Sequence, residues 1–349
     1  MPPPTTGAAG LPDFFADVEA LDEFLTRPDP GLVRDLAAVA GDLLVLGVAG
    51  KMGPTLARLA KRAAPDKRVV GVARFSDPGL AAKLESWGIE TIACDLMDRA
   101  AIESLPRLAN VVFMVGRKFG ATDALEETWA TNAYVAAMVA ESFRAARIVA
   151  FSTGCVYPFW PVAGGGAGED TPPAPPPGEY AQSCVARERL FEYASRRHAT
   201  PGRLIRLNYA IDLRYGVLHD VARAIHAGGP IDVTTGHVNV IWQGDANAWA
   251  LRSLARCTTP TSPLNVTGPE TVSVRALARA FSRRFDQPAR FTGSEAPQAW
   301  LNDAGRAFAL FGYPRVPLAR MIDWTADWIA RGGASLNKPT HFEEREGRF

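Results

Sequence analysis

The sequence predicts an α/β fold, a doubly wound parallel sheet followed by a smaller C-terminal lobe. Short apolar runs alternate with helical stretches from Leu43 to Asn208, which is typical of repeated strand–helix–strand units. A glycine-rich turn joins the first apolar run to the first helix. Past Asn208 the alternation weakens into short helices and loops, so a less regular lobe is expected there. With 349 residues, 47% of them apolar, the chain can bury such a core.

Six apolar runs predict the strands of the sheet. They lack the alternation of half-exposed strands, so helices should cover both faces of the sheet. Strands are expected at 43–48, 68–74, 91–96, 110–116, 147–154 and 203–208, and the main helices at 50–64, 123–145 and 180–197. Residues 158–179 hold seven prolines and are expected to form a loop.

The two ends of the chain flank this core. Residues 1–12 are rich in Pro, Gly and Thr and are expected to be disordered, and residues 13–40 to be helical with a break at Pro28 and Pro30. The polar end of the chain could be free or could fold back. The expected organisation is an N-terminal extension (1–42), a main α/β domain (43–208, completed by 236–268), a smaller lobe (209–235 and 269–335) and a polar tail (336–349).

Composition and charge exclude several classes of partner. Charged residues make up 21% of the chain and the net charge is +1, which indicates neither nucleic acid nor an anionic membrane as a partner. No apolar run reaches the roughly 18 residues of a membrane span, and the N-terminus lacks the pattern of a secretory signal. The four cysteines form no CxxC pair and the five histidines show no metal spacing, so we expect a reduced, cytoplasmic chain without a metal site.

The glycine-rich turn predicts a Rossmann-type site for a nicotinamide dinucleotide, NAD(H) or NADP(H). Gly47, Gly50 and Gly53 stand at GxxGxxG spacing between the first strand and the first helix. Glycines let a pyrophosphate approach the backbone, and the helix start offers free N–H groups and a positive dipole end. Lys51 and Met52 lie in the same turn and are assigned to the cofactor with it. The alternative is that these glycines only permit close packing of helix and strand.

The ends of the next strands bear on the choice of cofactor. Arg74 ends the second strand, where an acidic residue would favour NAD; a guanidinium there pairs well with a 2′-phosphate, so NADP is favoured and NAD stays possible. The alternative is a surface arginine stacked on adenine. Asp95 and Leu96 are expected beside the adenine, or Asp95 instead caps the next turn. Val115 and Gly116 end the fourth strand and are assigned to the nicotinamide end of the cofactor.

Several ordered motifs together resemble the extended short-chain dehydrogenase/reductase superfamily, the group of NAD-dependent epimerases and dehydratases. The resemblance covers about residues 43–330 and implies a sugar-like substrate under the smaller lobe. It also implies a homodimer in which helices 123–145 and 180–197 pair across a two-fold axis. The matching segments are GVAGKMG (47–53), CDL (94–96), Asn132, FSTGCVYP (151–158), EYAQSCVARERLFE (179–192), RLN (206–208) and NVTGPETVSVRALA (265–278).

The resemblance also implies the chemistry. Thr153 takes the place of the catalytic hydroxyl, Tyr180 that of the acid/base, and Asn208 lies near the substrate. A tyrosine can exchange a proton with a substrate oxygen at neutral pH only if its pKa falls from near 10 toward 7, which needs about 4 kcal/mol. Family members supply part of this with a lysine one helical turn after the tyrosine, which also holds the nicotinamide ribose. This chain has Cys184 at that position, beside the cofactor, and a neutral thiol supplies no positive charge.

Three interpretations of this departure stay open. In the first, another cation substitutes: Lys118 or Arg117, which follow the fourth strand, or Arg187, on the same helix face as Tyr180. The chain is then an NAD(P)-dependent oxidoreductase or epimerase that acts on a hydroxyl or keto group of a sugar, sugar acid or nucleotide sugar. In the second, the chemistry needs no strongly acidic tyrosine. In the third, the chain is a non-catalytic dinucleotide-binding sensor or scaffold.

The remaining candidates are substrate contacts. Some follow the sixth strand, where the smaller lobe begins, and others follow a short apolar run within that lobe. The full expected set is Arg117, Thr153, Asn208, Arg214, His219, Trp242 and Gln243.

Overall fold

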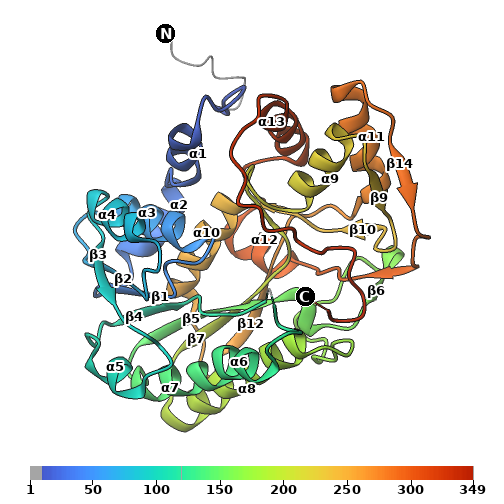
Figure 1. Cartoon of the computed structure of the whole chain (residues 1–349). Coiled ribbons are helices and arrows are strands. Elements are labelled where there is room, and N and C mark those ends of the chain that lie inside the picture. The colour runs from blue at the N-terminus through green and yellow to red at the C-terminus, as the bar shows by residue number, and fades with distance from the viewer. Residues whose placement is uncertain (1–9, 119, 349) are drawn as a thin grey trace.

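A parallel sheet forms the centre of the molecule (Figure 1), as predicted, but it has seven strands where six were expected, the additional one at Ser262–Val266. The computed structural model describes residues 10–118 and 120–348, so most of the stretch expected to be disordered (1–12) lies outside the described residues. The strand order is β12-β7-β5-β4-β1-β2-β3. The strands are β1 (Leu43–Leu46), β2 (Val69–Ala73), β3 (Glu90–Ala93), β4 (Asn110–Phe113), β5 (Arg147–Thr153), β7 (Gly202–Leu207) and β12 (Ser262–Val266).

Helices cover both faces of this sheet, because successive side chains of a strand point to opposite faces. Leu43 and Val45 of β1 pack with one helical layer, and Leu44 and Leu46 pack with the other. The first layer holds α2 (Pro30–Ala37), α3 (Gly53–Ala63), α4 (Pro78–Ser86), α10 (Gln243–Arg252) and α12 (Gly305–Phe311). The second holds α5 (Arg99–Ser104), α7 (Val135–Ser142) and α8 (Glu179–His198).

The helix expected at 123–145 is interrupted in its middle. It consists of α6 (Leu125–Trp129), a π-helical turn (Ala130–Tyr134) and α7. Within the turn, the backbone carbonyl of Asn132 accepts from Arg187 Nε at 3.0 Å, and the Asn132 side chain bonds the backbone N–H and carbonyl of Arg117. π-turns frequently occur at functional sites because they reposition one residue without ending the helix. Here the repositioned residue is Asn132.

The smaller lobe packs around two tryptophans, Trp242 and Trp324, whose ring centroids lie 5.4 Å apart. Figure 1 shows this lobe, coloured mainly yellow to red, beside the sheet. Its helices are α9 (Val217–His226), α11 (Val274–Phe285) and α13 (Leu318–Ala330). Its paired strands are β8 (Ala210–Ile211) with β11 (Ile241–Trp242), β9 (Pro230–Asp232) with β14 (Arg290–Thr292), and β10 (His237–Val238) with β13 (Val272–Ser273).

The segment expected to be a loop, 158–179, is mostly irregular. Trp160 and Pro161 form a two-residue strand, β6, that pairs with β15 (Gln298–Ala299). Three 3-10 turns occur at Gly154–Val156, Val162–Gly164 and Ser253–Arg256.

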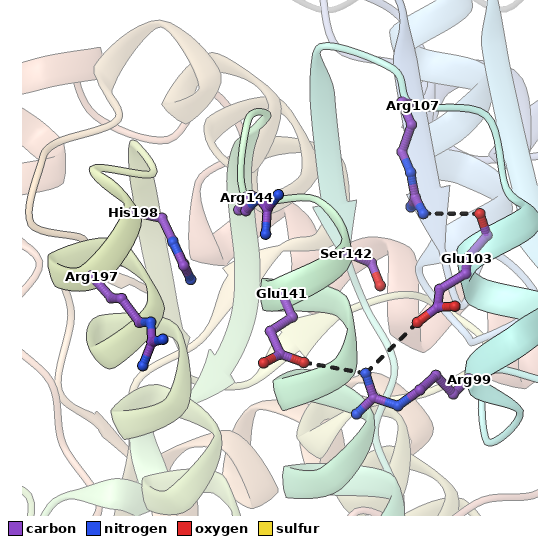
Figure 2. Close-up of a pocket in the computed structure, with 8 residues that line it drawn as sticks. All are labelled: Arg99, Glu103, Arg107, Glu141, Ser142, Arg144, Arg197 and His198. Atoms are coloured by element: carbon purple, nitrogen blue, oxygen red, sulfur yellow. Dashed lines mark hydrogen bonds and ion pairs between the residues drawn. The ribbon is translucent and has the colours of Figure 1, made fainter.

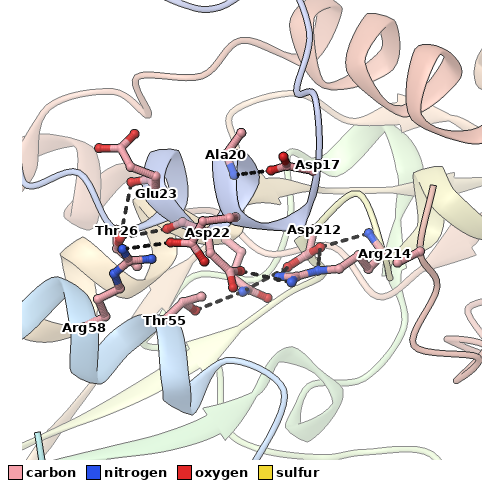
Figure 3. A network of polar contacts seen from close by, with 12 residues as sticks. Asp17, Ala20, Asp22, Glu23, Thr26, Thr55, Arg58, Asp212 and Arg214 are labelled. Carbon is pink, nitrogen blue, oxygen red and sulfur yellow. Dashed lines mark hydrogen bonds and ion pairs between the residues drawn. The ribbon is translucent and has the colours of Figure 1, made fainter. Parts of the chain in front are cut away.

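The N-terminal extension ties the two lobes together. It forms α1 (Val18–Leu25) and α2, separated at the predicted prolines, and Asp17 caps α1 by accepting from the Ala20 N–H at 2.8 Å. Asp22 of α1 pairs with Arg214 at 3.0 Å, and Arg214 also pairs with Asp212 at 2.6 Å (Figure 3). Of these two pairs, only the Asp22 pair joins the extension to the smaller lobe, and because it is largely shielded from water, loss of either partner would leave a buried charge uncompensated.

Candidate functional site

Two adjoining cavities follow the carboxyl ends of the parallel strands, where ligands bind in sheets of this topology. The first cavity has a volume of about 560 Å³ and is lined from the ends of β1, β2, β3 and β4. The second has a volume of about 150 Å³ and is lined from the ends of β5 and β7, the start of α8 and the smaller lobe. Gly47 and Gly50 line the first, and Lys51 and Met52, which follow them, line the second. The glycine turn therefore connects the two cavities.

The three glycines of the turn serve different purposes. Gly47 has φ +83°, and a Cβ there would lie 3.0 Å from the Val115 backbone nitrogen. A Cβ on Gly53 would lie 2.2 Å from the Val48 carbonyl oxygen, so Gly53 permits close packing of α3 on the sheet. A Cβ on Gly50 would meet only the Gly47 carbonyl, at 3.4 Å. The packing interpretation thus applies to Gly53, whereas Gly50 leaves the space beside the turn open.

The far end of the first cavity is lined by the residues expected around an adenosine. Arg74 is exposed at the end of β2, next to Phe75, whose φ is +51°. Asp95 and Leu96 line the cavity after β3, and the Asp95 carboxylate also accepts from the Met97 N–H at 3.0 Å. Asp95 therefore caps a turn and faces the cavity at the same time. Val115 and Gly116 line the opposite side, after β4.

The second cavity brings together the expected chemical groups. Thr153 ends β5 and Tyr180 opens α8, and both line the cavity. Lys118 lines it too, with its Nζ 5.9 Å from the centroid of the Tyr180 ring. Of the expected substrate contacts, Asn208 and Gln243 also line it. Gln243 is held by the Thr55 hydroxyl of α3 at 3.2 Å, and Asn208 donates to the Trp300 carbonyl at 3.0 Å.

The electrostatics around Tyr180 differ from what an acid/base requires. Burial raises the pKa of Tyr180 well above its ordinary value of 10, and the neighbouring thiols of Cys184 and Cys155 add to this effect. The Arg187 guanidinium and a hydrogen bond with Thr153 act in the opposite direction on this pKa. Burial also raises the pKa of Cys184 to about 11, so its thiol is neutral near pH 7. The position of the family lysine thus carries no charge.

The three candidate cations occupy different positions. Arg187 is buried behind Tyr180 and donates to the Asn132 carbonyl, the Asn132 side chain and the Phe151 carbonyl at 2.6 to 3.0 Å. Arg117 lies outside the second cavity and pairs with Glu127 at 2.6 Å. Lys118 faces the cavity, and burial lowers its pKa. Only Lys118 of these three lines the cavity where a substrate would meet Tyr180.

Three residues expected to contact the substrate instead pack within the smaller lobe. Trp242 is 1% exposed and lies in the aromatic cluster with Trp324. Arg214 is engaged by its two aspartates, and His219 is buried with its ring nitrogens bonded to the Leu213 carbonyl and the Ser335 hydroxyl at 2.7 and 3.0 Å. The structure brings none of these three into the second cavity.

Other residues of the site were not expected from the sequence. Cys155, Tyr209 and Tyr215 line the second cavity, and the Nζ of Lys51 lies 3.2 Å from the centroid of the Tyr215 ring. The C-terminal tail folds back, so that Thr340 lines the second cavity and Lys338 the first. The position of each of these residues depends on contacts between distant parts of the chain, which no local sequence motif predicts.

A buried polar network supports the end of β5. Ser152 donates to Glu188 at 2.6 Å, and Glu188 forms an ion pair with Arg206 at 2.7 Å. Arg206 also donates to the Tyr157 hydroxyl at 2.7 Å, which in turn donates to Asn265 at 2.9 Å. Since buried ion pairs are stable only when their remaining polar groups are satisfied, this network fixes α8 relative to β5 and β7. The network thereby fixes the position of Tyr180, on α8, relative to Thr153, at the end of β5.

A third cavity lies away from this site. It has a volume of about 520 Å³ and lies among α5, the end of α7 and the end of α8 (Figure 2). Figure 2 shows Arg99 between two acidic side chains, Glu141 at 3.2 Å and Glu103 at 3.9 Å. Its basic groups are thus partly neutralised by its own carboxylates. Among the described residues there is no group of side chains that could hold a metal ion, and no helix long and apolar enough to cross a membrane.

Solved structures with this fold are numerous. A UDP-glucuronic acid 4-epimerase from Bacillus cereus, in complex with UDP-glucuronic acid and NAD, superposes with a TM-score of 0.68 at 19% identity, covering 83% of this chain and 99% of that one. A UDP-glucose 4-epimerase from Thermotoga maritima, with UDP-glucose, gives 0.68 at 16% identity with the same coverage. An epimerase from Methanothermobacter thermautotrophicus gives 0.69 at 16% identity, covering 87% of this chain and 96% of that one. At these identities the likeness establishes the fold.

The family assignment comes from the sequence itself. No curated protein matches the chain. The family model described as "NAD dependent epimerase/dehydratase family" matches residues 43–242, more than half of the chain. The matched range includes the glycine turn, the Thr153 strand end and the Tyr180 helix. The chain therefore belongs to the NAD-dependent epimerase/dehydratase family.

Proposed function

We propose that this protein is an NAD(P)-dependent oxidoreductase or epimerase that acts on a hydroxyl or keto group of a sugar, sugar acid or nucleotide sugar. One observation carries the proposal: Tyr180, Thr153 and Lys118 line the same small cavity as Lys51 and Met52 of the glycine turn. A proton-transfer group thus lies beside the place where the reactive end of a dinucleotide would be. The UDP-sugar complexes of the two 4-epimerases support a sugar-like substrate.

The residues of the first cavity fit a dinucleotide. The turn of Gly47 and Gly50 leaves room beside the start of α3, whose first N–H groups and dipole favour a pyrophosphate. Leu96 and Val115 offer apolar contacts on either side of the space for an adenine and its ribose. When bound, the nicotinamide would accept a hydride from the substrate carbon or return it.

Different residues of the second cavity have different roles in proton transfer. Tyr180 holds the proton that moves to or from the substrate oxygen, and the Thr153 hydroxyl positions that oxygen by hydrogen bonding. In this proposal two cations share the tasks of the family lysine. Arg187, fixed behind Tyr180, favours its ionised form, and Lys118, which faces the cavity, holds the nicotinamide ribose. Arg117, Arg214, His219 and Trp242 are left out of the proposed substrate contacts.

The preferred cofactor is proposed to be NADP. Arg74 is exposed at the cavity rim, where its guanidinium can pair with a 2′-phosphate. The complexes of the Bacillus cereus and Thermus thermophilus epimerases contain NAD, so NAD is the alternative to be measured beside it.

We also propose a homodimer located in the cytoplasm. Apolar side chains remain exposed on the helices expected to pair: Leu125 (44%), Trp129 (39%) and Tyr193 (59%). Met138 and Phe143 of the helix at 123–145, which were also expected on its apolar surface, are buried in the core beside the sheet instead. The four cysteines are all free thiols, which suits a reducing compartment. Light scattering at micromolar concentration tests the dimer.

The test of function is cofactor-linked turnover. Wild-type protein, with NAD or NADP, is assayed by absorbance on a panel of sugar alcohols, sugar acids and nucleotide sugars. The proposal predicts turnover of at least one, and a decrease in kcat of about 10²-fold or more for Tyr180→Phe with unchanged cofactor affinity. Cofactor binding without turnover on any compound would favour a non-catalytic sensor instead.

A further inference from the structure

The C-terminal tail is an ordered part of the site. After α13 the chain runs back across the smaller lobe toward β6 (Figure 1). The Leu336 N–H donates to the Arg214 carbonyl at 3.0 Å, and the Thr340 N–H and hydroxyl both donate to Asp220 of α9 at 2.8 and 2.6 Å. Phe342 is 6% exposed within the lobe core, and Arg345 lies 3.9 Å from the centroid of the Phe159 ring. Residues 334–347, here named the strap, are therefore anchored on both sides of the cavities.

Two residues of the strap reach the cavities themselves. The Thr340 carbonyl accepts from Lys118 Nζ at 3.0 Å and lines the second cavity. Lys338, two residues earlier and exposed, lines the first cavity together with Gly47 and Gly50. The strap thus crosses the molecule where the two cavities meet.

Three lysines converge at this crossing from distant parts of the chain. Lys51 belongs to the glycine turn, Lys118 follows β4 and Lys338 comes from the strap. Burial lowers the pKa of Lys51 to about 6, and the positive charges of Lys118 and Lys338 contribute to this lowering, against a smaller opposing effect of Asp220 and Asp212. Like charges so placed destabilise one another unless an anion lies between them.

We propose that the strap closes over the dinucleotide and that Lys338 binds its pyrophosphate. This rests on the proposed function, since it assumes that the cavity of the glycine turn holds a dinucleotide. A pyrophosphate at that turn would carry negative charge beside the start of α3, within the cavity that Lys338 lines, and so would favour the protonated forms of the neighbouring lysines. The strap and the cofactor would then stabilise one another, because each supplies charges that the other lacks.

The test is ligand affinity measured by calorimetry for wild type, Lys338→Gln and a matched control, Arg348→Gln. The control removes a positive charge from the same tail at a residue that pairs only locally, with Glu346 at 3.1 Å. We expect Lys338→Gln to weaken NAD, NADP and ADP-ribose about 10-fold each, as loss of one charge-assisted contact would, and to leave adenosine unchanged. Arg348→Gln should bind all four ligands as wild type does, and Lys338→Arg should retain most of the affinity.

Hydrogen exchange supplies a second readout. Binding of NAD or ADP-ribose should slow exchange of the strap amides, above all those of Leu336 and Thr340, in wild type and less so in Lys338→Gln. Equal affinities in wild type and Lys338→Gln, with unchanged exchange in the strap, would overturn the inference while the proposed function stands. A loss confined to NADP would also overturn it, since the contact would then be to the 2′-phosphate. Failure of wild type to bind any dinucleotide would overturn the proposed function itself.

Discussion

The two cavities of this protein differ in how closely they follow their family. In the first, the glycine turn and the ends of β1 to β4 present the expected residues in the expected places. In the second, Thr153 and Tyr180 line the cavity, but Cys184 stands at the position of the family lysine, and the nearby cations are Lys118 and Arg187. On the proposed function, this difference means that dinucleotide binding depends on local backbone geometry, whereas proton transfer depends on charge that positions other than 184 supply.

The largest effect on ligand affinity is expected at the glycine turn of the first cavity. Gly50→Asp should reduce dinucleotide affinity by about 100-fold or more, because a carboxylate there repels the pyrophosphate. The fold should survive, since a Cβ at this position meets only the Gly47 carbonyl at 3.4 Å. Calorimetric titration together with a thermal melt checks both statements. A folded variant with wild-type affinity would remove the first cavity as the dinucleotide site.

A smaller effect is expected at the rim of the same cavity. Arg74→Ala should weaken NADP about 10-fold and NAD much less, because only NADP has the 2′-phosphate that a guanidinium would pair with. Titration of both cofactors into both proteins gives the ratio. An unaltered ratio would mean that Arg74 stacks on the adenine or stays in solvent.

A separate prediction concerns the pH dependence of stability and tests the charge of Lys51 in the second cavity. Lys51 has a pKa of about 6 in the folded protein against an ordinary 10.5, so between these values the unfolded chain binds a proton that the folded protein lacks. Its contribution therefore makes stability rise with pH across this window, and Lys51→Met should flatten that rise and stabilise the protein most at low pH. Denaturant unfolding at several pH values measures the slope. A slope identical in both proteins would contradict the lowered pKa.

The sequence predicts the features that depend on neighbouring residues, and it does not predict those that depend on contacts between distant parts of the chain. The strands and the glycine turn follow from short apolar runs and from glycines at one strand end, so their positions could be predicted. The sequence does not predict that Trp242 and Arg214 pack within the smaller lobe, because their partners Trp324 and Asp22 lie far away in the chain. The strap carries no periodic pattern, so the sequence leaves open whether it folds back and does not predict that it lines the cavities. The division of the chain into domains stays a prediction.

The break in the helix at 130–134 has the same explanation. Its residues favour a continuous helix, and the interruption arises from Asn132, whose partners Arg117 and Arg187 lie on other elements. Hydrogen bonds from one residue to other elements can interrupt a helix that the local sequence favours.

The central claim is that cations at other positions, Lys118 facing the cavity and Arg187 beside Tyr180, replace the missing lysine. It is tested by kcat/KM for Lys118→Gln, Cys184→Lys and the double variant, with Arg117→Gln as the control, because Arg117 lies outside the second cavity. Lys118→Gln should lower kcat/KM about 10-fold or more, and Cys184→Lys alone should impair the site because it crowds another positive charge against Arg187 and Lys118. The double variant should recover much of the activity lost by Lys118→Gln. Wild-type activity in Lys118→Gln, or an increase in Cys184→Lys alone, would contradict the account.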